Sequence, residues 1–145
     1  MNHIQNIKAF EESHKSFNFL NPEVQGCDLD YCYEKNGQVL ILEGKMAING
    51  IFYLKWAQWK MLQTLKNLLR REGNIYYVIN DKDRYWIEEI NSDNFRTSGG
   101  HVGSGFFRYK DKGLCKKIDL SNVKWYTKEE IKQKILNITN TFTKI

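Results

Sequence analysis

The chain has 145 residues, of which 41% are hydrophobic and 14% aromatic, and its formal net charge is +5. This composition excludes general disorder, and the length fits one domain, 1–145, with a real hydrophobic core. No stretch approaches the roughly 18 consecutive apolar residues of a membrane span, so no membrane partner is expected. The three cysteines lack metal-ligand spacing, which favours a reducing, cytoplasmic setting.

The charge is divided unevenly along the chain. Residues 1–43 hold three Lys or Arg against seven Asp or Glu, whereas residues 44–145 hold nineteen against ten. A metal-dependent enzyme acting on nucleic acid needs this combination, because carboxylates bind the cation while lysines and arginines bind phosphates. The abundance of Asn, Ile and Lys beside a single proline is also typical of a bacterial or phage protein.

The first predicted element is an amphipathic helix over 3–19, in which spacings of three and four join Ile4, Ile7, Phe10 (or Glu11), His14 and Phe17. Asn21-Pro22 ends it.

A hairpin is predicted next, because apolar and polar residues alternate on both sides of Asn36-Gly37, the strongest short-range signal for a two-residue turn. That turn places Asp30 opposite Glu43 and Asp28 opposite Lys45, with all four side chains on one face. The other face, expected to pack on the core, carries Leu29, Tyr31, Tyr33, Leu40 and Leu42.

The paired acids of this hairpin predict a cation site. Like charges directly opposite each other are destabilising unless something neutralises them, and Mg²⁺ (or Mn²⁺) prefers such hard oxygen ligands. Asp30 and Glu43 would bind the ion with the carbonyl of Gly44, and Lys45 could hold the attacking water or stabilise charge on a phosphate. Asp28 competes with Asp30 as the first ligand, but Asp30 is preferred because it lies directly across from Glu43. The alternative is a solvated strand face with an Asp28–Lys45 pair.

These residues resemble a known family. Asp30, the hairpin and Glu43-Gly44-Lys45 ending an apolar strand look like the core of the PD-(D/E)XK nuclease superfamily, the fold of many restriction enzymes and Holliday-junction resolvases. The resemblance implies an α/β (α+β) fold, with a restriction-endonuclease-like mixed central sheet flanked by helices. It also implies Asp30 and Glu43 as metal ligands and Lys45 as the catalytic lysine. Two positions depart from the family pattern: Leu29 replaces the proline before the first acid, and Gly44 replaces an apolar spacer.

A long helix is predicted over about 52–71, where tryptophans and leucines recur at helical spacing and Arg70-Arg71 with Gly73 form a stop. In similar nucleases this helix can present a glutamine or lysine to the scissile phosphate. Gln58 is therefore a candidate catalytic residue, and a solvated helix face is the alternative.

Two strands are predicted to follow. The continuous apolar run Ile75–Ile79 is typical of a buried central strand after a crossover helix. Residues 81–84 form a turn, and Tyr85–Ile90 form the next strand.

The segment 96–117 is rich in glycine and holds six Lys or Arg against one Asp, with aromatic residues between them. It is either a loop that binds the nucleic-acid backbone or a surface hairpin beside a glycine loop. The candidate nucleic-acid contacts are Arg96, Arg108, Lys110, Lys112, Lys116 and Lys117.

The last predicted element is an amphipathic helix from Thr127 to about Ile138, opened by a capping box of Thr127 and Glu130. Together, the predictions describe a domain core at about 1–91, a basic hairpin or loop within 95–120 and this C-terminal helix.

The leading functional hypothesis is an Mg²⁺-dependent endo- or exodeoxyribonuclease, acting on DNA in preference to RNA, with a homodimer as one possible assembly. The alternative is a catalytically inactive nuclease-fold protein with a binding or regulatory role, for example a phage protein acting on a host complex.

Overall fold

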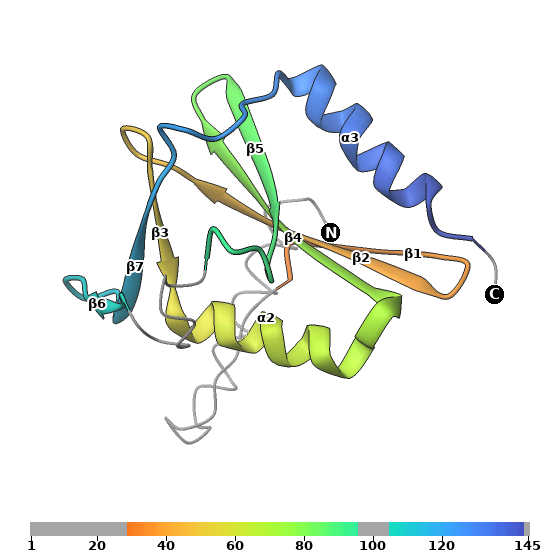
Figure 1. Ribbon diagram of the computed structural model, residues 1–145, viewed down its shortest axis with the longest axis horizontal. Coiled ribbons are helices and arrows are strands. Elements are labelled where there is room, and N and C mark those ends of the chain that lie inside the picture. Colours follow the sequence, from red (N-terminus) through yellow and green to blue (C-terminus); the bar gives the residue numbers. More distant parts are fainter. Residues whose placement is uncertain (1–28, 96–104, 144–145) are drawn as a thin grey trace, which may run out of the picture.

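The computed structural model describes residues 29–95 and 105–143 (Figure 1). The helix predicted over 3–19, Asp28 and Arg96 lie outside these residues. The strands and helices are β1 (Tyr31–Lys35), β2 (Gln38–Met46), β3 (Ile51–Lys55), α2 (Trp56–Leu69), the short 3-10 helix η1 (Arg70–Glu72), β4 (Gly73–Asp81), β5 (Arg84–Glu89), β6 (Phe107–Arg108), β7 (Leu114–Asp119) and α3 (Lys128–Asn140). This mixture confirms the predicted α/β (α+β) class.

The larger sheet has the strand order β1-β2-β4-β5 and is mixed. Strand β2 pairs antiparallel with β1 and parallel with β4, and α2 lies between β2 and β4 in the chain. Asn36 and Gly37 have φ values of 56° and 82°, as a type I′ hairpin turn requires. The predicted register is confirmed, since Tyr31 lies opposite Leu42 and Lys35 opposite Gln38.

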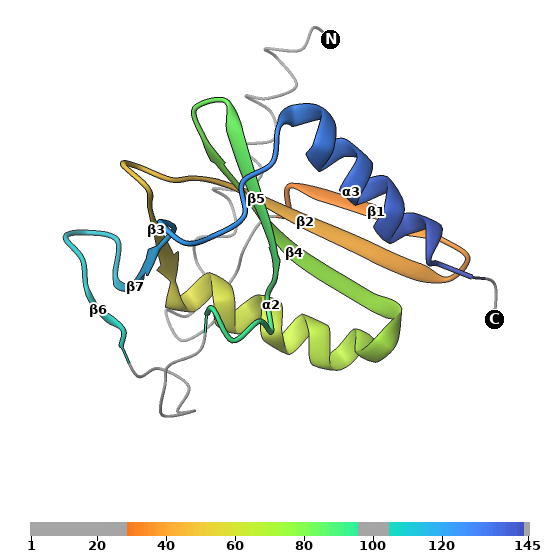
Figure 2. The ribbon, with the colours of Figure 1, turned by 45° about the horizontal axis from the view of Figure 1, so that its top comes forward.

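Both faces of this sheet are covered by a helix, as Figure 2 shows. On one face, Ile41, Ile75 and Ile79 pack with Trp59 and Leu62 of α2. On the other face, strands β2 and β5 pack with α3 through Leu40, Leu42, Ile87, Ile131 and Phe142. The apolar run at 75–79 is therefore a central strand packed on both sides, as predicted.

Strand β1 corrects one expectation about the hairpin. Tyr31 and Tyr33 are 56% and 51% exposed, and Leu29 is also exposed, whereas Leu40 and Leu42 beside them are buried. The reason is that β1 is at the edge of the described strands, and α3 packs its apolar side chains on β2 and β5 instead.

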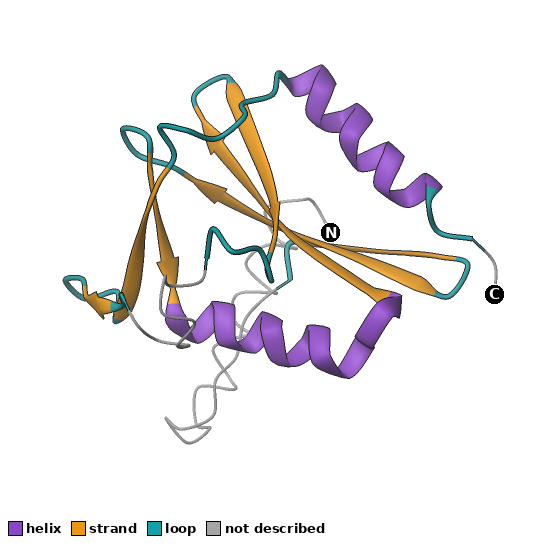
Figure 3. Cartoon of the chain, in the orientation of Figure 1, coloured by secondary structure: helices purple, strands orange, loops and turns teal. Residues whose placement is uncertain are grey.

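A second sheet, β3-β7-β6, lies at the N-terminal end of α2 (Figure 3). It corrects the predicted start of the long helix, which begins at Trp56 and not at residue 52. Residues 51–55 pair with β7, and their alternation buries Phe52 and Leu54, so long-range pairing overrides the helical spacing. Two interpretations of the basic segment were open, and its residues 107–117 form the predicted surface hairpin, made of β6 and most of β7.

The C-terminal helix α3 begins as predicted. The Thr127 hydroxyl accepts a hydrogen bond from the Glu130 N–H (3.2 Å), and the Glu130 carboxylate accepts one from the Thr127 N–H (3.0 Å). Beyond its far end, the Asn36 side chain donates to the Phe142 carbonyl (2.7 Å), which ties the hairpin turn to the C-terminal segment. Within the described ranges, none of the helices is long and apolar enough to cross a membrane.

Candidate active site

The open end of the β1–β2 hairpin brings the two predicted acids together. Just before β1, the Asp30 N–H donates to Oε1 of Glu43 (3.0 Å), and Asp30 Oδ2 accepts a hydrogen bond from the Gly44 N–H (2.8 Å). Each acid is therefore held by the backbone of the opposite chain segment. In an antiparallel pair, the N–H and C=O of one residue face the same neighbour, so the Gly44 carbonyl also faces the Asp30 side.

Glu43 is the most unusual member of this group because it is only 1% exposed. An ionised carboxylate is costly to bury unless it is hydrogen-bonded or binds a cation. Gln58, in the first turn of α2, donates from Nε2 to Glu43 Oε2 (3.2 Å). Tyr77 lies beside Glu43 in the parallel register of β4, and its hydroxyl donates to Gln58 Oε1 (3.3 Å). A chain of three side chains thus joins β4, α2 and β2.

Asp30, Glu43 and Gln58 line one pocket of about 480 Å³. Its charged side chains are Asp30, Glu43, Lys45, Lys55 and Lys112, so three lysines surround two carboxylates. Lys45 is half-buried, and the ion pairs between described residues do not include it.

The N-terminus of α2 also forms part of the pocket wall, through Lys55, Trp56, Ala57 and Gln58. Its N-cap residue, Lys55, makes no side-chain capping hydrogen bond, and its first turn contains no acidic residue. The free N–H groups and the helix dipole at such an end favour an anion. The pocket therefore combines oxygen ligands for a cation with positive groups for a phosphate.

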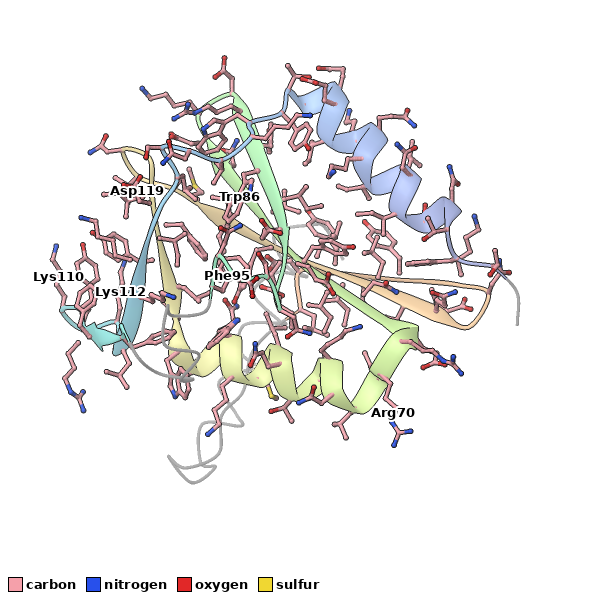
Figure 4. The ribbon with its side chains drawn as sticks, in the orientation of Figure 1. Arg70, Trp86, Phe95, Lys110, Lys112 and Asp119 are labelled. Carbon is pink, nitrogen blue, oxygen red and sulfur yellow. The ribbon has the colours of Figure 1, made fainter. Side chains whose placement is uncertain are left out.

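The predicted nucleic-acid contacts fall into separate places. Lys110 and Lys112 lie on the β6–β7 turn (Figure 4), and only Lys112 lines the pocket. Arg108 is exposed on β6, and Lys117 is exposed on β7 opposite Tyr53. Lys116 instead donates to the Phe95 carbonyl (2.9 Å), and partial burial lowers the pKa of its ammonium group.

Sequence reasoning missed two polar residues of the site. Tyr77 is fully buried in an apolar run, but it is the one position of that strand that lies beside Glu43 in the register. Lys55 was assigned to the body of a helix, although it is the last residue of a strand and the N-cap of α2. Each could have been found only by placing β4 and β3 beside their partners.

The donor set fits a small hard cation. Asp30, Glu43 and the Gly44 carbonyl carry the oxygen atoms that could serve as ligands, and a carboxylate oxygen has two lone pairs, so it can accept a hydrogen bond and also bind a cation. Among residues 29–95 and 105–143, no group of three or more His, Cys, Asp or Glu side chains could hold a metal ion. Two carboxylates completed by a carbonyl, water and substrate suit Mg²⁺, which usually keeps several waters.

Comparison with models of known protein families finds no match for this sequence, and comparison with curated proteins also finds none. The functional argument therefore depends on the site itself.

Proposed function

We propose that this chain is a metal-dependent nuclease of the PD-(D/E)XK type, which hydrolyses phosphodiester bonds of DNA in the cytoplasm. One observation carries the proposal: a single pocket is lined by Asp30, Glu43, Lys45 and Gln58, together with basic groups. Strand β4 pairs parallel with β2, and α2 lies between them in the chain; this mixed sheet flanked by helices is what the family resemblance implies, and it supports the same conclusion.

Asp30 and Glu43, with the Gly44 carbonyl, would hold Mg²⁺ or Mn²⁺. When bound there, such an ion would polarise a phosphoryl oxygen and lower the pKa of a bound water. Lys45 projects from the same strand face as Glu43, two residues on, so its ammonium group can orient the attacking water or stabilise negative charge on the phosphate.

Gln58 acts in this proposal as a positioning residue. Its amide bridges Tyr77 and Glu43 and so fixes the orientation of the buried carboxylate. The N–H groups at the start of α2, with Lys55 and Lys112, would bind the phosphates that flank the scissile bond.

A binding or regulatory protein without catalytic activity is the second candidate. Its supporting observation is that both Glu43 oxygens accept hydrogen bonds from the protein, so the carboxylate is also suited to a purely structural role. This candidate predicts no binding of Mg²⁺ at millimolar concentration, whereas the nuclease predicts binding that Asp30→Asn abolishes.

Cleavage of plasmid DNA, single-stranded DNA and RNA should be measured with Mg²⁺, with Mn²⁺ and with EDTA. The informative variants are Glu43→Gln and Lys45→Ala, with Glu129→Gln and Lys132→Ala on the exposed surface of α3 as matched controls. We expect both site variants to lose at least about 100-fold in rate and both controls to retain activity. Unchanged cleavage by folded Lys45→Ala protein would refute the mechanism.

A further inference from the structure

The β3-β7-β6 sheet carries aromatic and lysine side chains on the face turned away from the core. Because Phe52 and Leu54 are buried, Tyr53 and Lys55 point to the opposite side. In the register of the sheet, Lys117 lies opposite Tyr53. Opposed residues emerge on the same face, so a ring and an ammonium group lie side by side.

The β6 strand and its turn add two more rings to this face. The Tyr109 ring stacks on the Tyr53 ring, with 4.3 Å between centroids and 13° between planes. Phe107, opposite Cys115 in the register, meets the Tyr109 ring edge-on at 6.0 Å and is 40% exposed. The rings of Tyr53, Tyr109 and Phe107 therefore form one continuous cluster, and Cys115, which lies opposite Phe107 in the register, is buried.

Positive charge surrounds the rings. The ammonium groups of Lys110 and Lys112 lie 5.3 and 5.9 Å from the centroid of the Tyr109 ring. Figure 4 shows both lysines at the β6–β7 turn, far from Arg70 at the opposite end of α2. The acidic residues here are Asp111 in the turn and Asp119, two residues after Lys117 on the same face of β7, and the lysines of the face outnumber them. Lys55 and Lys112 also line the candidate active site, which makes the face continuous with that pocket.

We propose that this aromatic–lysine face, made of Tyr53, Phe107, Tyr109, Lys55, Lys110 and Lys117, binds single-stranded DNA. Unpaired bases stack on aromatic rings regardless of sequence, while lysines bind the phosphates between them. A duplex keeps its bases stacked inside the helix and needs only the cations, so the rings favour an unpaired strand. The inference rests on the proposed function in one respect: it takes the bound strand to be the substrate, which continues from this face into the candidate active site.

Binding can be measured without cleavage, by fluorescence anisotropy of a labelled oligo(dT) with the full chain in EDTA. We expect Phe107→Ala and Tyr109→Ala each to weaken binding by about 5- to 150-fold, the range observed for the loss of one stacked base. Lys117→Gln should reduce the dependence of log Kd on log salt by about 0.7. Tyr33→Ala and Lys132→Gln, exposed on β1 and α3, are the aromatic and cationic controls and should bind as the wild type does.

Because Tyr109 packs on Tyr53, a thermal melt must show that Tyr109→Ala is still folded. Phe107 and Lys117 are exposed, so loss of binding in their variants does not reflect unfolding. Duplex DNA bound as tightly as oligo(dT), or unchanged affinity in Phe107→Ala and Lys117→Gln, would overturn the inference. Oligo(dU) should bind at least as tightly as oligo(rU), and a tenfold preference for oligo(rU) would overturn the assignment to DNA.

The two proposals fail separately. Binding that the face variants weaken, in a protein that cleaves no substrate with any metal, supports the face and refutes the hydrolase. Metal-dependent cleavage by a protein whose face variants bind oligo(dT) normally supports the hydrolase and refutes the face.

Discussion

Replacing Gln58 by alanine tests whether the bridge between Tyr77 and Glu43 exists. The substitution removes a hydrogen bond to a carboxylate, typically about 1.5–3 kcal/mol, and one from a phenol, typically about 0.5–1.5 kcal/mol. Gln58 is half-buried, both bonds are long, and alanine is a slightly better helix former, so we expect a net loss of about 1–3 kcal/mol. For a chain of this size the midpoint temperature should fall by roughly 3–10 °C.

The assay is urea unfolding followed by circular dichroism, which needs no knowledge of the activity. Asn67→Ala provides the matched control, because Asn67 is an exposed amide on the same helix and should change stability by less than about 0.5 kcal/mol. Tyr77→Phe should cost about 1 kcal/mol. Because both changes remove the same hydrogen bond, the double variant should be about 1 kcal/mol more stable than additivity predicts.

A free energy of unfolding for Gln58→Ala within about 0.5 kcal/mol of the wild type would refute this reasoning. Gln58 would then belong to a solvated helix face, and the orientation of Glu43 would need another explanation.

Four further predictions concern the metal, the C-terminal helix and the hairpin turn. Adding Mg²⁺ at about ten times its Kd should stabilise the wild type by about 1.4 kcal/mol, seen as a rise in the melting temperature. The melting temperature of Asp30→Asn should stay unchanged. An equal rise in both proteins would exclude this site. Thr127→Ala should lower the free energy of unfolding by about 1 kcal/mol, measured by urea titration. Hydrogen bonds with Thr127 lower the pKa of Glu130 in the folded protein below its ordinary value of 4.5. The stability that the Glu130 carboxylate adds is therefore present above pH 4.5 and is lost as the pH falls through the lowered pKa of the folded state. Glu130→Gln should therefore be less stable than the wild type near pH 7, and this difference should shrink as the pH falls below 4.5; a difference that stays constant in acid would contradict the capping role. Gly37→Ala should lower the free energy of unfolding by about 1 kcal/mol in a urea titration, because the φ of Gly37 is 82° and alanine is strained at a positive φ. An unchanged midpoint would argue against the type I′ turn.

Features that depend on a few neighbouring residues could be predicted from the sequence. The Asn36-Gly37 turn determined the register of β1 with β2, and this register alone brings Asp30 to Glu43. The capping box at Thr127 determined the start of α3. In both cases the hydrogen bonds that decide the conformation form within three or four residues, so no distant partner can change the outcome.

Features that depend on distant partners were decided by the tertiary structure. A helix was predicted from about residue 52, but residues 51–55 form a strand because β7, some 60 residues further along the chain, pairs with them. Lys116 looked like any other cation of its segment, and only the position of the Phe95 carbonyl turns it away from solvent. Gln58 and Lys112 join the acids because the N-terminus of α2 and the β6–β7 turn line the same pocket as the open end of the β1–β2 hairpin. Long-range packing selects one conformation among several that the local sequence allows, which is why the acids could be predicted from the sequence while the pocket around them could not.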